Sequence, residues 1–82
     1  MNTGYGLYIQ DQPSGWRRLG VYSTPTEAIE QFRDFVSSPP AARNAIPNLL
    51  SGNMLRGREL STGRLVIVGP MDRLIQSRIA QR

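Results

Sequence analysis

The sequence predicts a small α+β domain with two β-hairpins and two principal helices, in the order ββα, a helical connector and ββα. Three observations predict this fold with a mainly antiparallel sheet: short apolar or alternating segments, breaks at proline and glycine, and two stretches with apolar residues at helical spacing. With 82 residues there is room for one core, so we expect residues 1–82 to form a single domain.

The first hairpin is predicted by alternation. Leu7 and Ile9 alternate with more polar residues over positions 5–11, which is typical of a half-buried strand. Pro13-Ser14-Gly15 supplies turn residues, and a second strand is expected over residues 16–22. On the second strand, alternation predicts that Leu19 and Val21 share one face.

The first helix has the clearest local signal. Thr24 fits an N-cap, Pro25 the first helical position, and Glu27 the third, from which its carboxylate can reach back to the cap amide. A helix is therefore expected over residues 25–37, ending before Pro39-Pro40. Its apolar stripe is Ala28, Ile29, Phe32, Phe35 and Val36.

A connector follows at residues 39–53. Residues 41–46 are expected to form one short helical piece, with Pro47 opening a second turn that Gly52 closes. The large aliphatic residues here favour a segment that covers an open side of the core over a disordered linker.

The second half repeats the hairpin and helix. Strands are expected over residues 54–60 and 64–69, around the turn Ser61-Thr62-Gly63. The second strand is continuously apolar, as in a strand buried on both faces. Asp72 is expected to cap a final helix. Its apolar face would comprise Met71, Leu74, Ile75 and Ile79.

The composition argues against catalysis. Histidine and cysteine are absent, so the common general base, the thiol nucleophile, disulfides and the usual zinc ligands are all missing. Glu30 and Asp34 lie four apart, which fits a solvated acidic helix edge, and no Gly-x-Ser-x-Gly or phosphate-loop spacing occurs. We therefore expect a non-enzymatic protein with no cofactor, no metal and no catalytic residue.

The N-terminus and the apolar runs bear on localisation. Residues 1–4 do not resemble a signal peptide, and the longest apolar run, residues 65–68, is too short to span a bilayer. We expect a cytoplasmic protein without a membrane partner.

All ten basic residues are arginine, and against six acidic residues they give a net charge of +4. Three explanations stay open: the codon usage of a GC-rich genome, selection for guanidinium groups that fork onto phosphates, and avoidance of lysine modification.

The hairpins carry the candidate binding residues. Arg56 and Arg58, two apart on a strand, should share one face, whereas the adjacent Arg17 and Arg18 should point to opposite faces. Arg64 could stand near Arg58 or Arg56 across the turn. Arginines beside aromatic residues are typical of a nucleic-acid surface. The candidates for binding nucleic acid or another partner are Tyr8, Trp16, Arg17, Arg18, Arg56, Arg58 and Arg64.

One segment resembles a known class of modules. Residues 19–24, Leu-Gly-Val-Tyr-Ser-Thr, followed by Glu27-Ala28, are similar to the strand–helix junction of the ββα arm-binding modules of integrases and of similar DNA-binding modules. The resemblance covers residues 5–36. It implies nucleic-acid binding by the first hairpin and helix.

Two functions remain open. The first is a nucleic-acid-binding module that uses an arginine-bearing sheet face. The alternative is a protein-binding inhibitor or accessory factor from a phage, plasmid or small bacterial operon, which an open sheet edge would suit. The same edge could pair two copies of the chain into a homodimer.

Overall fold

A single four-stranded sheet forms the centre of the molecule. The computed structural model describes residues 4–12 and 15–81, and its strands follow the order β2-β1-β4-β3 with every neighbouring pair antiparallel. The two predicted hairpins are thus joined through their strands β1 and β4. The strands are β1 (Tyr5–Gln12), β2 (Gly15–Tyr22), β3 (Leu55–Arg58) and β4 (Leu65–Pro70).

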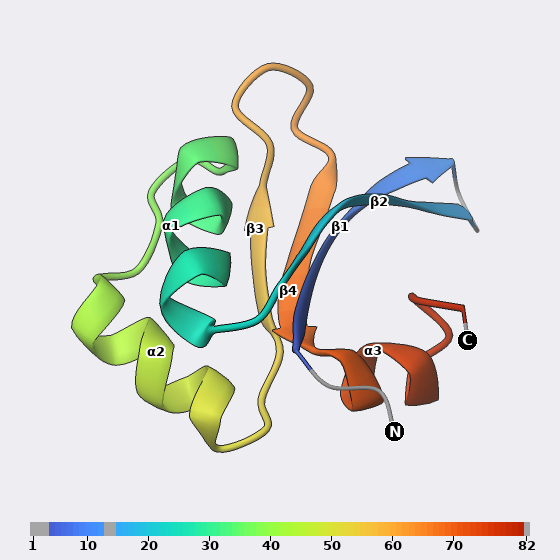
Figure 1. Cartoon of the computed structure of the whole chain (residues 1–82). Helices are drawn as coiled ribbons and strands as arrows, with labels where there is room; N and C mark the ends of the chain where they lie inside the picture. The colour runs from blue at the N-terminus through green and yellow to red at the C-terminus, as the bar shows by residue number, and fades with distance from the viewer. Residues whose placement is uncertain (1–3, 13–14, 82) are drawn as a thin grey trace.

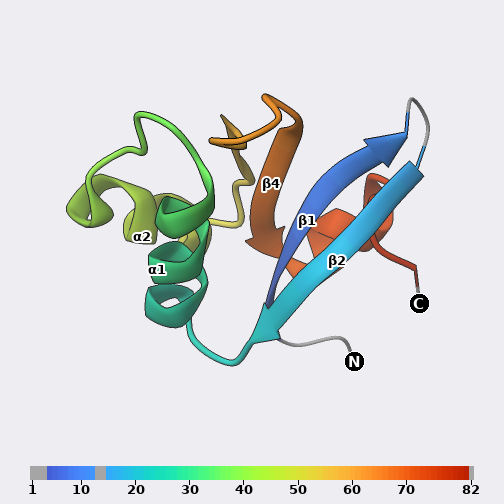
Figure 2. The same cartoon turned by 90° about the horizontal axis from the view of Figure 1, so that it is seen from above.

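Within the described residues, three helices cover the two faces of this sheet (Figures 1 and 2). Helices α1 (Pro25–Phe35) and α2 (Ala42–Leu50) lie on one face, which we call the α1 side. Helix α3 (Met71–Gln76) and the residues after it lie on the other, the α3 side. The predicted α+β fold is confirmed, with the strands placed to within two residues. None of the helices in the described part of the chain is long and apolar enough to span a bilayer.

Each side of the sheet has its own apolar core. On the α1 side, Phe32 packs against Leu7 and Ile9 of β1 and against alternate residues of β4, all of them fully buried. On the α3 side, Leu74 packs with Tyr8 and Ile67. Strands β1 and β4 are therefore buried on both faces, as the continuous apolar run of β4 predicted.

Helix α1 begins at the predicted cap. The Thr24 hydroxyl accepts a hydrogen bond from the backbone N–H of Glu27 at 3.2 Å. The Glu27 carboxylate, however, accepts from the hydroxyls of Ser23 and Thr24, at 3.3 and 3.1 Å, in place of the expected contact with the cap amide. The helix ends at Phe35, two residues earlier than expected, because Val36 forms a bridge to Glu59 beside β3.

The connector is one continuous helix, and the prediction of two pieces divided at Pro47 is wrong. Pro47 lies inside α2, where it has no N–H to donate to the carbonyl of Arg43; both residues are exposed, so water can reach that carbonyl. After the helix, Gly52 has φ of +90° and donates to Leu49, while Asn53 donates to Asn48. These two bonds form a Schellman motif, which satisfies the last carbonyls of α2.

Helix α3 starts earlier than expected, so the prediction that Asp72 is its N-cap is wrong. Pro70 occupies the cap position and Asp72 lies in the first turn without a side-chain capping bond, where its charge still suits the helix dipole. Ile79, expected on the helix, is buried just beyond its end.

An irregularity in β2 changes which residues share a face. Gly20 lies opposite Leu7 and Arg18 opposite Tyr8, so Leu19 is an extra residue between the two pairs. A bulge of this kind interrupts the alternation of side chains. Leu19 packs on the α1 side, whereas Val21 lies opposite Gly6, whose Cβ position faces Met71 and Leu74 on the α3 side, so the prediction that Leu19 and Val21 share a face is wrong. Pro13 and Ser14 of the expected turn lie outside the described residues.

Candidate functional site

The strand register sorts the predicted arginines onto the two faces. Arg18 lies opposite Tyr8, Tyr8 opposite Ile67, and Ile67 opposite Arg56, so these four residues form one row across the α3 side. Because Arg58 lies two residues beyond Arg56, it points the same way, as predicted. Three of the five candidate arginines therefore share the α3 side.

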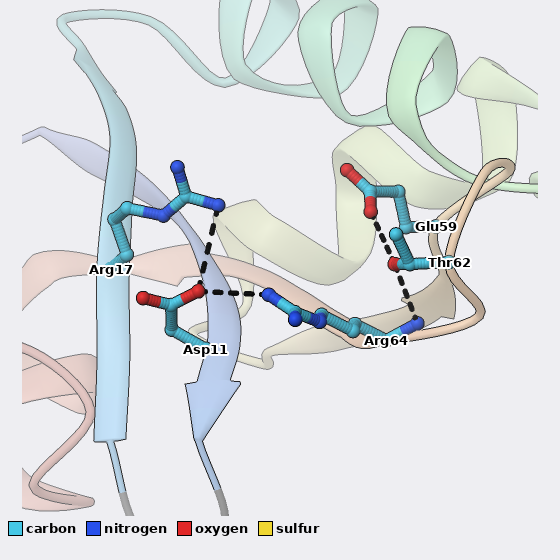
Figure 3. A network of polar contacts seen from close by, with 5 residues as sticks. All are labelled: Asp11, Arg17, Glu59, Thr62 and Arg64. Carbon is cyan, nitrogen blue, oxygen red and sulfur yellow. Dashed lines mark hydrogen bonds and ion pairs between the residues drawn. The ribbon is translucent and has the colours of Figure 1, made fainter.

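The other two candidates, Arg17 and Arg64, lie on the α1 side around Asp11 (Figure 3). The Asp11 carboxylate accepts a hydrogen bond from Arg64 Nη1 at 2.8 Å and forms an ion pair with Arg17 Nη2 at 3.7 Å. All three side chains are exposed to solvent, so this pair of contacts contributes about 1 kcal/mol or less to stability. Arg17 and Arg64 thus point away from the other three candidates, and the carboxylate of Asp11 neutralises part of their positive charge.

The turn between β3 and β4 fixes the direction of Arg64. The backbone N–H of Arg64 donates to the Thr62 hydroxyl at 3.2 Å, and that hydroxyl donates to the Glu59 carboxylate (Figure 3). Arg58 does approach this turn, since its Nη1 donates to the Gly63 carbonyl at 3.4 Å. The side chains of Arg58 and Arg64 nevertheless leave opposite faces of the hairpin, contrary to the expectation that they stand together.

A hollow of about 480 Å³ opens on the α3 side, between the first hairpin and the chain after α3; we call it the Trp16 hollow. It brings together three predicted residues, Tyr8, Trp16 and Arg18. Tyr8 is only 5% exposed, so it forms part of the base of the hollow and offers little of its ring to a partner. Trp16 is partly buried against the α3-side core. The lining is Tyr8, Gly15, Trp16, Arg18, Arg78, Ile79 and Gln81.

Arg78 belongs to this hollow but was not among the predicted site residues. It follows the C-cap of α3 with φ of +61°, and it donates from its backbone to Ile75 while Ile79 donates to Leu74. This is the same Schellman motif that ends α2, with arginine in the place of glycine. The signal in the sequence that could have identified Arg78 was the end of the last predicted helix, which no glycine follows.

A second hollow, of about 550 Å³, lies between α3 and the chain that leads from α2 into β3. Arg56 of β3 and Arg73 of α3 both line it, together with Met54. Each hollow thus brings two arginines together, Arg18 with Arg78 in the Trp16 hollow and Arg56 with Arg73 in the second.

The described charges divide unevenly between the two sides of the sheet. The α3 side carries five arginines and one carboxylate, whereas the α1 side carries four arginines and five carboxylates. On the α3 side these residues are Arg18, Arg56, Arg58, Arg73, Arg78 and Asp72. On the α1 side they are Arg17, Arg33, Arg43, Arg64, Asp11, Glu27, Glu30, Asp34 and Glu59. Within residues 4–12 and 15–81, the ion pairs involve only Asp11 on the α1 side.

Two other kinds of site are a metal site and an exposed apolar surface. Over the described ranges, no three carboxylates gather where they could hold a metal ion. The large exposed hydrophobic residues of the described chain belong to three different elements: Val21 to β2, Leu50 to α2 and Leu60 to the β3–β4 turn.

Comparison of the chain with protein families, curated proteins and solved structures finds no match.

Proposed function

We propose that the protein binds nucleic acid through the arginines of its α3 side. The observation that carries this proposal is the excess of arginine over carboxylate on that side, against a near balance on the α1 side. A one-sided positive surface attracts the phosphate backbone and orients the protein on it.

The chemistry of the individual side chains supports the proposal. Arg18, Arg56 and Arg58 are exposed and, among the described residues, form no ion pair. Arg58 uses one N–H on the Gly63 carbonyl, which leaves other N–H groups of its guanidinium for a phosphate. A guanidinium can bind two phosphate oxygens at once, so a row of arginines across a sheet provides several such contacts.

The test compares two double variants that remove equal charge from opposite sides. Arg56→Ala with Arg58→Ala should weaken binding to labelled DNA of arbitrary sequence and lower the salt slope by about 2, because two phosphate contacts are lost. Arg17→Ala with Arg64→Ala should leave the affinity and the slope close to those of the unmodified protein. The measurement is fluorescence anisotropy across a salt series, starting at low ionic strength.

Absence of binding by the unmodified protein at low salt would overturn the proposal, because phosphate contacts are strongest there. Equal losses in the two double variants would contradict the assignment to the α3 side.

The outer edge of β2 favours a second candidate, a protein partner or a second copy of the chain. In the described structure β2 pairs only with β1, whereas the edge of β3 is partly covered by Val36, Ser37 and Leu60. An open edge of eight residues can accept an added strand. Sedimentation over a range of concentrations should then show a dimer that Val21→Lys disrupts; a monomer throughout would contradict self-pairing.

A further inference from the structure

We infer that the α3 side receives a single nucleic-acid strand in preference to a duplex, with one nucleotide in the Trp16 hollow. The base lies against Trp16 and the phosphate between Arg18 and Arg78. This inference rests on the proposed nucleic-acid binding and adds to it the form of the ligand and the place of one of its units.

The size of the hollow suits one unit of a strand. At about 480 Å³ it falls within the range of about 300–1,000 Å³ that is typical of small-molecule sites. A base inside a duplex is paired and stacked, and entering such a hollow would require flipping it out at a cost in free energy. A base of a single strand has no partner to leave, so the hollow favours single strands.

The lining supplies both interactions that a nucleotide needs. The indole of Trp16, with Ile79 nearby, offers an apolar surface on which any base can stack. Arg18 and Arg78 add two guanidinium groups, and none of the described lining residues is acidic. An aromatic group with an attached anion therefore fits this hollow better than a neutral or cationic ligand does.

The backbone of Arg78 is an independent observation in favour of this assignment. Its φ of +61° lies in the left-handed region, where glycine or asparagine is favoured because a Cβ atom is crowded there. Glycine does occupy the equivalent position after α2, at Gly52. At position 78 the chain instead carries a guanidinium that lines the hollow.

A free mononucleotide has the same base and phosphate chemistry, but the rest of the α3 side favours a strand. Arg56 and Arg73 line the second hollow, and Arg58 lies two residues beyond Arg56 on the same face of β3. These arginines can contact phosphates beyond the Trp16 hollow, which a mononucleotide does not provide.

Trp16 provides a direct readout because it is the only tryptophan of the chain. We would titrate the protein with a thymidine oligonucleotide of about 12 nucleotides, within the range of single-strand site sizes. Parallel titrations would use a duplex of the same length and thymidine monophosphate. We expect the oligonucleotide to quench Trp16 fluorescence and to bind about tenfold or more tightly than either of the others.

Variants then locate the nucleotide. Arg18→Ala and Arg78→Gly should each weaken single-strand binding about tenfold, whereas Arg43→Ala, on the α1 side, should have little effect. Arg78→Gly removes the guanidinium and also relieves the positive φ, so it should unfold no more easily than the unmodified protein. Trp16→Phe should retain most of the affinity and Trp16→Leu should lose about tenfold, because stacking needs an aromatic face.

The outcomes separate the two proposals. If anisotropy detects no binding of any nucleic acid at low salt, the proposed function and this inference both fail. The inference alone is overturned if duplex binds as tightly as the single strand, or if the monophosphate binds as tightly as the oligonucleotide. It is also overturned if binding occurs without Trp16 quenching and without loss in the Arg18 and Arg78 variants.

Discussion

Gly52 and Arg78 occupy equivalent positions after a helix, but only at position 52 does the residue type match the backbone conformation. Gly52 and Arg78 each follow the C-cap of a helix, and each has positive φ within a Schellman motif. A Cβ atom at Gly52 would meet no other atom within 4 Å, so only the backbone conformation favours glycine there. The same conformation disfavours arginine at position 78, where the side chain lines the Trp16 hollow.

At the residue scale, Tyr22 should make stability sensitive to alkaline pH. Partial burial raises the pKa of the Tyr22 phenol above its usual value, and the nearby charge of Glu27 raises it further. The unfolded phenol therefore ionises first, so the free energy of unfolding is fully retained below about pH 10 and falls as the pH rises from there through the higher folded-state pKa. Tyr22→Phe should show a smaller fall between about pH 9, where both forms keep the phenol or phenyl ring neutral, and about pH 12, measured by urea denaturation. An equal fall in both proteins would contradict this role.

Among the elements, β3 shows how closely a strand and a helix approach one another. A Cβ atom added to Gly57 would lie 2.8 Å from Cγ1 of Val36 and 3.2 Å from the ring of Phe32. Glycine at this position lets β3 pass against the end of α1, where the Val36–Glu59 bridge forms. This close packing also explains why α1 ends at Phe35, since the next residue already has extended backbone.

At the element scale, the start of α1 should depend on the Thr24 hydroxyl. Thr24→Ala removes the acceptor of the Glu27 N–H and should lower the free energy of unfolding by about 1 kcal/mol. Thr24→Ser keeps that acceptor and should retain most of the stability. Urea denaturation followed by circular dichroism would measure both changes, and equal losses in the two variants would show that the hydroxyl is not the cause.

Across the whole molecule, the two apolar cores share the central strands. Leu7 and Ile9 of β1 face the α1-side core while Tyr8 between them faces the α3-side core, and β4 alternates in the same way. Neither core can unfold alone, because its loss would expose side chains of β1 and β4, the strands that both cores share. We therefore expect the domain to unfold as one cooperative unit.

Because the two cores unfold together, a substitution that destabilises the α3-side core should destabilise the α1-side core by the same amount. Leu74→Ala removes a fully buried side chain and should lower the free energy of unfolding by about 2–5 kcal/mol. Trp16 fluorescence reports on the α3 side, whereas far-ultraviolet circular dichroism reports chiefly on α1 and α2. The two transitions should coincide in the variant and in the unmodified protein. Separate midpoints would contradict a single unit.

The features that depend on neighbouring residues were predictable from the amino-acid sequence. Alternation, turn residues and the Thr24 cap predicted both hairpins and the first helix, because strand period, turn geometry and capping act within a few positions. The expected roles of Pro47 and Asp72 are wrong, because proline is typical of a first helical turn and aspartate of a cap, whereas Pro47 lies inside α2 and Asp72 follows the cap of α3.

The tertiary structure alone decided the arrangement of the candidate site. Pairing of β1 with β4 across about 60 residues sets which arginines share the α3 side, and the extra residue Leu19 fixes the faces along β2. The residues near a strand do not indicate which distant strand it pairs with, or in which register. The approach of Arg78 to Trp16 depends on the same pairing, because β4 places α3 and the residues after it beneath the first hairpin.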